Sequence, residues 1–241
     1  MTKSGSTGRT EQIRAAAACA LLVALLAGCG GLQPEDAGQA LRQGGAATAR
    51  LKTVSATLKF SKGTISFRTF TLVSATASVR LPDDSDTIYT VRQQDVQFGL
   101  EIVIAGGRVF IHLPFTTLTE LTGKDAADIP DLAKLFDPAT GLPAVIPNGR
   151  NPKYLGVDKV DDVDSHKVEV TYSPDQIHGM LSQLTSAGDV DAIVWIGGSD
   201  HLVRKAILSG PFGDNGAAST VEVDMHGFNQ AVRIASPAPQ P

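Results

Sequence analysis

The sequence has few cysteines, few aromatic residues and no run of basic residues. Only Cys19 and Cys29 are cysteines, and Cys19 lies in a segment expected to be removed, so no internal disulfide can form and stability must come from packing. Aromatic residues make up 5% of the chain, and the small aliphatic residues that dominate suit either a plain sheet core or a hollow one. A net charge of −4 without a basic cluster disfavours nucleic-acid binding.

The sequence also lacks a recognisable zinc site or catalytic triad. The histidines are His112, His166, His178, His201 and His226. None has the H-E-x-x-H spacing or the cysteine pairing that is typical of zinc sites. Ser199-Asp200-His201 contains the residue types of a triad, but neighbours on a hairpin turn cannot converge in space.

Two further clusters are interpreted as turns. Asp158, Asp161, Asp162 and Asp164 lack the spacing of a calcium loop. The glycines between residues 210 and 216 lack the following lysine and helix of a phosphate loop. We therefore expect that the chain is not an enzyme and binds no metal or cofactor.

The N-terminus has the pattern of a secretory leader. A basic stretch precedes the apolar run Ala15 to Ala27, which is too short to span a bilayer. The run ends in Leu26-Ala27-Gly28-Cys29, which resembles the bacterial lipobox. The resemblance implies a signal peptide at 1–28, cleavage between Gly28 and Cys29, and lipidation of Cys29. Alternatives are an ordinary secretory signal with a chance cysteine and an uncleaved anchor.

Lipidation at Cys29 would place the chain at the outer face of the cell membrane, with residues 29–33 as a lipidated tether. Pro34, Glu35 and Asp36 then indicate the acidic first turn of a helix. The apolar residues that follow recur at weak helical spacing.

Alternation with a period of two follows the helix. It is clearest at 98–104 and 109–113, where Gly106-Gly107 between the two runs predicts a hairpin with one apolar face. Tyr89 and Val91 indicate the strand before this hairpin. Phe70, Leu72 and Val79 indicate an earlier, less regular strand.

Prolines interrupt the alternation between residues 114 and 152, and proline cannot occupy a central strand. Apolar residues from Ile129 to Phe136 have helical spacing. This region therefore predicts two or three short helices, joined by turns at Asp137-Pro138 and Asn148-Gly149.

Strands resume near Val168. Ser173-Pro174-Asp175-Gln176 is a capping box, and it predicts a helix that ends near Gly188. Four closing strands are predicted at 191–196, 201–208, 220–225 and 231–235.

The short connections between these strands predict an antiparallel sheet. Helices collected on one face of such a sheet give an α+β fold. We expect a single domain over residues 34–235 and a disordered proline-rich tail at 236–241.

The carboxyl half resembles the mycobacterial LppX/LprA/LprF/LprG lipoprotein family. Three stretches carry the resemblance: Asp137-Pro138 with Gly141, then Ile193-Val194-Trp195-Ile196, then His201-Leu202-Val203-Arg204. The likeness covers about residues 137 to 235. It implies a LolA/LolB-like fold, in which a curved antiparallel half-barrel sheet carries helices over its concave face and an apolar cavity lies between them.

The resemblance further implies a carrier of multi-acylated lipids or glycolipids across the cell envelope. The lipobox makes the membrane a partner through the N-terminal lipid anchor. A carrier anchored in this way must hand over its lipid locally or work with a membrane lipid exporter as a further partner. The alternative is a non-catalytic sensor or assembly module that acts by protein–protein contact. The candidate cavity-lining residues are Tyr89, Val91, Phe98, Leu100, Ile102, Ile104, Val109, Ile111, Leu113, Leu132, Leu135, Phe136, Leu142, Val145 and Ile146.

A polar stretch from Arg80 to Asp95 departs from the apolar alternation. It contains Asp83, Asp84, Asp86, Arg92 and Asp95. Two interpretations fit it: a cavity rim that meets a lipid head group, or an edge strand protected by charge.

Overall fold

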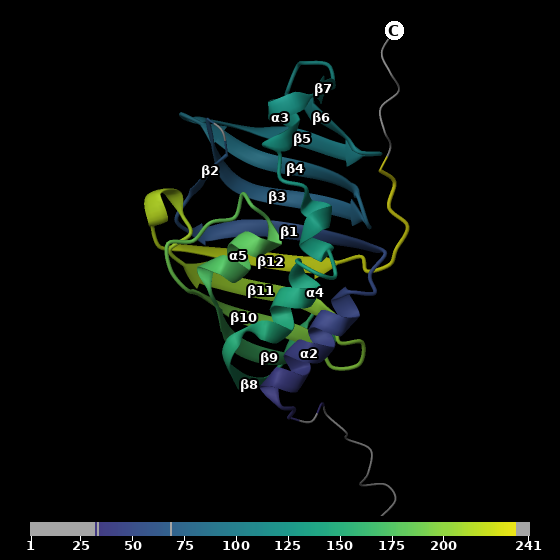
Figure 1. Cartoon of the computed structure of the whole chain (residues 1–241), viewed down its shortest axis with the longest axis vertical. Helices are drawn as coiled ribbons and strands as arrows, with labels where there is room; N and C mark the ends of the chain where they lie inside the picture. Colours follow the sequence, from purple (N-terminus) through teal and green to yellow (C-terminus); the bar gives the residue numbers. More distant parts are fainter. Residues whose placement is uncertain (1–31, 33, 68, 235–241) are drawn as a thin grey trace, which may run out of the picture. The chain divides into compact units, whose positions relative to one another are not determined.

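The computed structural model describes residues 32, 34–67 and 69–234 (Figure 1). The predicted signal peptide, the lipidation of Cys29 and the tail at 236–241 lie outside the described residues. Among the helices in the described part, none is long and apolar enough to cross a membrane.

The described chain forms one large sheet in which every strand pair is antiparallel, as predicted. Eleven strands follow the order β7-β6-β5-β4-β3-β1-β12-β11-β10-β9-β8, and β2 pairs with β3 beside this path. The strands are β1 (Thr53–Lys62), β2 (Ile65–Phe67), β3 (Phe70–Arg80), β4 (Asp84–Gln93), β5 (Val96–Ala105), β6 (Arg108–His112), β7 (Thr119–Leu121), β8 (Arg150–Val160), β9 (Val163–Tyr172), β10 (Val190–Gly197), β11 (Val203–Gly210) and β12 (Ser219–His226).

Short helices accompany the sheet and complete the predicted α+β fold. They are α2 (Ala37–Thr48), α3 (Gly123–Ala127), η1 (Leu132–Phe136), α4 (Leu142–Val145), η2 (Ile146–Asn148), α5 (Pro174–Met180) and η3 (Asp214–Gly216). In Figure 1, α2, α4 and α5 lie over the same face of the sheet, which we call the inner face. Helix α2 packs against β8, β9 and β10, whereas η1 packs against β3 and β4.

The helices predicted from Pro34 and from Ser173 are both present, with different bounds. Helix α2 begins at Ala37 rather than at Pro34, because Asp36 is its N-cap and accepts a hydrogen bond from the Gln39 backbone N–H at 2.8 Å. The capping box of Ser173 and Gln176 is confirmed. The helix it opens ends at Met180, not near Gly188, because the backbone of Leu181 is extended and its side chain is buried.

The strand prediction missed β1 and β8 and the two short strands β2 and β7. Strand β8 contains Pro152 and lies at the edge of the sheet, where proline costs no ladder hydrogen bond. The predicted strand at 231–235 is wrong for its described residues, because 231–234 form no strand. Val232 and Ile234 instead pack against Val103 and Phe110 on the face opposite the helices. The alternation of apolar and polar residues at 231–234 therefore comes from the burial of Val232 and Ile234, not from pairing with another strand.

The apolar inner face divides into two clusters. The first, which we call the helix-covered cluster, joins α2, η1, α4 and α5 to β8–β11 and includes Leu41, Phe136, Val170 and Ile196. The second, which we call the β3–β6 cluster, is built around Tyr89, Leu100 and Ile102. The two clusters share one sheet, but most of the helices lie over the first.

A buried histidine fixes the start of the domain to the sheet. His166 on β9 has a 4% exposed side chain, and its Nε2 lies 3.1 Å from Glu35 Oε2. The Tyr154 hydroxyl lies 3.2 Å from His166 Nδ1. A neutral ring that carries its proton on Nε2 donates to Glu35 and accepts from Tyr154. Burial lowers the pKa of His166, and this outweighs the opposing attraction of Glu35.

We expect the free energy of unfolding to fall as the pH drops below about 6.5, the ordinary histidine value. The unfolded chain then binds a proton that the folded chain resists, so the contribution is complete above that pH and is lost below it. Urea unfolding across this range checks the trend. His166→Gln should flatten it, while His226→Gln, at the exposed end of β12, should not. Equal slopes in all three proteins would contradict the assignment.

Candidate functional site

Nine of the predicted lining residues meet in the β3–β6 cluster. Five are buried and four are partly exposed. They are Tyr89, Val91, Leu100, Ile102 and Ile104, followed by Phe98, Val109, Ile111 and Leu113. The sequence therefore located one continuous apolar surface on β4, β5 and β6.

Strand register explains why these side chains share a face. Ile104 pairs with Val109 and Ile102 pairs with Ile111 across the β5–β6 hairpin. Its turn is Gly106-Gly107, where both residues have positive φ, as a two-residue hairpin turn requires. Side chains alternate between the two faces of a strand, and every second residue here is apolar. The whole set therefore lies on the inner face.

The other six predicted residues belong elsewhere. Leu132, Leu135, Phe136, Leu142, Val145 and Ile146 all pack in the helix-covered cluster. The sequence analysis predicted that all fifteen residues line one cavity. In the structure, α4 and η2 pack against α2, and η1 packs against α4 and against β3 and β4.

A pocket of about 900 Å³ opens beside the β5–β6 turn. Ile104 and Val109 are the two predicted residues that line it. Its apolar part is completed by Ile129, Met180 and Leu181. Sequence reasoning assigned these three only to helical segments, and no local signal marks them, because β5, the η1 region and the end of α5 meet only in the folded chain.

The rim of this pocket is acidic. Asp83, Asp84, Asp131 and Asp137 line it together with the single cation Lys134. The sequence had left open whether the polar stretch at 80–95 is a rim or a protected edge. The edge interpretation is wrong, because β4 lies between β3 and β5.

Two rim carboxyls are perturbed in opposite directions. Burial raises the pKa of Asp131, although the Ala133 N–H donates to its carboxylate at 3.1 Å. Burial acts in the same direction on Asp84. The Arg80 guanidinium at 2.7 Å and the Gly106 N–H at 3.0 Å outweigh it and lower the pKa of Asp84. Asp84 is thus a structural carboxylate that fixes the turn, and Asp131 is the one more easily protonated.

Other residues singled out in the sequence serve as turns. Ser199, Asp200 and His201 connect β10 to β11, and Asp200 pairs with Arg204. Asp161 and Asp162 form the β8–β9 turn with positive φ. Within the described ranges, no group of three histidine, cysteine, aspartate or glutamate residues is placed to hold a metal ion.

Comparison with known proteins finds relatives of one kind. Residues 36–234 match the family described as LppX_LprAFG lipoprotein. The lipoarabinomannan carrier protein LprG of Mycolicibacterium hassiacum is 30% identical over 156 residues, which is 64% of this chain and 64% of that protein. LprG of Mycobacterium tuberculosis is 27% identical over 133 residues, 54% of each chain. This chain therefore matches less than two thirds of the length of these relatives.

Solved structures agree on the fold. LprF from Mycobacterium bovis has a TM-score of 0.68 at 18% identity, covering 87% of this chain and all of that one. The lipoprotein LppX from Mycobacterium tuberculosis has a TM-score of 0.59 at 17% identity, covering 82% of this chain and 97% of that one. Since the family match spans nearly the whole described domain, the chain belongs to the LppX_LprAFG lipoprotein family.

Proposed function

We propose that the chain binds an acylated lipid or glycolipid on the inner face of a curved half-barrel sheet and carries it across the cell envelope. It does so from the outer face of the cell membrane, where a lipidated Cys29 anchors it. One observation carries the proposal: the 900 Å³ pocket adjoins the β3–β6 cluster. Large side chains of this cluster, among them Phe98 and Ile111, stay partly exposed on a face that a solid core would cover.

The physical chemistry of lipid transfer fits such a surface. Each buried methylene is worth about 0.8 kcal/mol relative to water, so a long acyl chain does not cross an aqueous gap unaided. An apolar groove replaces the bilayer as solvent, which makes extraction nearly neutral in free energy. No nucleotide is then required for the binding step itself.

The relatives narrow the class of cargo. LprG proteins are named as carriers of lipoarabinomannan, which supports an acylated glycolipid as cargo here. The acidic rim agrees with a head group rich in hydroxyls, because carboxylates accept hydrogen bonds from hydroxyl groups. Even with Asp84 paired to Arg80, the carboxylates of Asp83, Asp131 and Asp137 outnumber Lys134 and disfavour an anionic phosphate at the rim.

Filling the pocket tests the proposal. Gly179 lines it, and a Cβ added there meets no atom within 4 Å, so a larger side chain can leave the backbone at this point without a clash. We expect Gly179→Trp to reduce the lipid retained on detergent-free purification by about tenfold, the equivalent of 1.4 kcal/mol. Native mass spectrometry of protein from a host with its natural envelope lipids measures this.

The matched control is Gly99→Trp. Gly99 is exposed on β5, on the face opposite the pocket, and its added Cβ meets only Ile88, at an ordinary 3.8 Å. This variant should retain lipid like the parent. A parent protein that carries no lipid and takes up none would overturn the carrier proposal and favour the protein-contact module.

A further inference from the structure

The loop between β6 and β7 presents the most exposed large apolar side chain in the described part of the chain. Phe115 is fully exposed, at 107% of its reference area, and Val96, which follows the β4–β5 turn, comes next at 64%. From Leu113 to Thr119 the loop contains no charged residue. An uncharged, water-exposed loop with an aromatic tip is unusual for a surface that faces only solvent.

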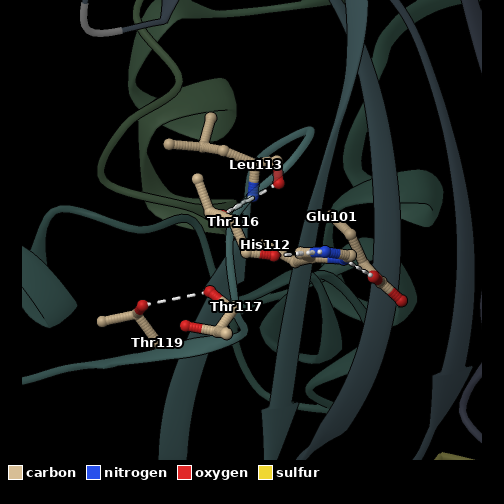
Figure 2. Close-up of polar contacts among 6 residues, drawn as sticks. All are labelled: Glu101, His112, Leu113, Thr116, Thr117 and Thr119. Atoms are coloured by element: carbon tan, nitrogen blue, oxygen red, sulfur yellow. Dashed lines mark hydrogen bonds and ion pairs between the residues drawn. The ribbon is translucent and has the colours of Figure 1, made fainter.

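The loop is held in a fixed shape rather than left free. Thr116 Oγ1 donates to the Leu113 carbonyl at 2.9 Å and accepts from the Leu113 N–H at 3.2 Å (Figure 2). His112 Nε2 lies 3.1 Å from the Thr116 carbonyl, and its Nδ1 lies 3.0 Å from Glu101 Oε2. Thr119 Oγ1 donates to the Thr117 carbonyl at 3.1 Å. These contacts tie the loop to strands β5 and β6.

The turn itself places an unfavourable residue at its tip. The Thr116 N–H donates to the Leu113 carbonyl at 3.2 Å, which closes a four-residue turn with Pro114 second and Phe115 third. Phe115 has φ +63°. This position normally takes glycine or asparagine, because a bulky side chain is strained in the left-handed region. The fold therefore holds an aromatic ring outward where a small residue would be more stable.

The tip continues into the apolar inner face. Phe98 pairs with Val91, and Val96 pairs with Gln93. Phe98 and Val96 therefore lie at the end of β5 that is away from the acidic pocket. The rings of Phe70 and Phe98 meet edge to face at 5.4 Å. Leu113, the first residue of the loop, packs in the β3–β6 cluster. A contiguous apolar path thus leads from the tip to the surface that we propose binds acyl chains.

Charge distinguishes the two ends of these strands. At the tip end, Lys62 and Arg92 are exposed near two aspartates, Asp95 and the Asp214 that accepts hydrogen bonds from Thr64 and Ser66. The opposite end carries the acidic rim of the pocket. The charges at the tip end balance, whereas the rim is acidic, so an anionic surface would repel the rim and favour an approach by the tip end.

We propose that the loop at 113–119 docks on the lipid bilayer, with Phe115 inserted at the interface. The proposal deepens the proposed function, since it places acyl chains next to the β3–β6 cluster as they leave the membrane. A stable protein partner would need about 1,200–2,000 Å² of buried surface, which one aromatic tip does not offer. A bilayer would need much less if the lipid proposed at Cys29 already tethers the protein, because an anchor and a weak second contact act together.

Fluorescence tests the docking directly. The full-length protein, purified from a host that attaches its lipid anchor, is reconstituted into vesicles of equimolar phosphatidylcholine and phosphatidylglycerol with brominated acyl chains. The chain has one tryptophan, Trp195, which is buried and gives a constant background. We expect Phe115→Trp to add a blue-shifted emission that the brominated lipid quenches. Ile88→Trp, half exposed on the face opposite the inner one, should add an emission that the lipid leaves unquenched.

A second variant connects docking to transfer. Phe115→Asp should slow lipid movement between protein and vesicles several-fold while leaving the amount of bound lipid unchanged. Equal, water-like emission from both tryptophan probes would overturn the docking proposal, even if the protein still binds lipid. A Phe115→Trp emission that shifts with protein concentration in the absence of vesicles would assign the tip to a second copy and overturn it too. Quenching without any bound lipid would sustain docking and reject the carrier.

Discussion

Truncation of Leu41 to alanine is expected to lower the free energy of unfolding by about 3–5 kcal/mol. Leu41 lies on α2, is 1% exposed and belongs to the helix-covered cluster. Removing its side chain loses the transfer free energy of the buried methyl groups and leaves a cavity that the sheet cannot close. Denaturant unfolding with an unchanged m-value measures the loss.

The control for this prediction is Leu155→Ala on β8. Leu155 is 39% exposed, and a change there should stay within about 0.5 kcal/mol. Leu41 also lies outside the residues that line the pocket, so lipid retention should not change with its truncation. A loss below about 1 kcal/mol for Leu41→Ala would mean that α2 is not part of the rigid core.

Replacement of Gly141 by alanine should cost about 2–3 kcal/mol, although it adds only one methyl group. The new Cβ would overlap the Leu135 carbonyl, at 2.7 Å from its carbon and 2.8 Å from the Asp137 nitrogen. These are backbone atoms, so no side chain can move aside. The Asp137 carboxylate accepts hydrogen bonds from the Ala139 and Thr140 N–H groups and fixes this turn. Strain at Gly141 must therefore be taken up by the backbone.

Gly179→Ala is the matched control, since its Cβ enters open space on α5. Alanine there should leave stability unchanged or raise it by about 0.5–1 kcal/mol, because it reduces the backbone entropy lost on folding. Both variants are compared by urea unfolding. Equal stability of Gly141→Ala and the parent would contradict the prediction, since it would mean that the backbone of this turn can move to make room for the added Cβ. The comparison also gives a physical reason for the Asp137-to-Gly141 pattern: one residue caps the turn and the other leaves room for its backbone.

The acidic pocket and the apolar tip lie at opposite ends of the same strands, and together they give the proposed carrier a direction. Acyl chains would enter from the tip end and the head group would lie at the rim. The Gly179→Trp and Phe115→Asp variants address these two ends separately: the first should change the amount of lipid retained and the second its rate of exchange.

Features that depend on neighbouring residues could be predicted from the sequence. The alternation at 98–113 around Gly106-Gly107 gave the β5–β6 hairpin and its apolar face, because a period of two is a local property of a strand. The capping box at Ser173 gave the start of α5 for the same reason, since both of its hydrogen bonds lie within four residues. The nine lining candidates on β4–β6 came together because they follow from these local patterns.

Features that depend on contacts between distant segments follow only from the folded chain. The sheet is joined in its middle by β1 and β12, whose paired residues Ser55 and His226 are far apart in the sequence. The short helices between residues 132 and 148 were correctly expected. The packing of α4 and η2 against α2, and of η1 against β3 and β4, follows from which apolar surfaces meet. Helical spacing specifies that a side is buried and not what buries it. For the same reason, Val232 and Ile234 have the alternation of a strand without being one. Met180 and Ile129, about fifty residues apart, line one pocket only in the folded chain.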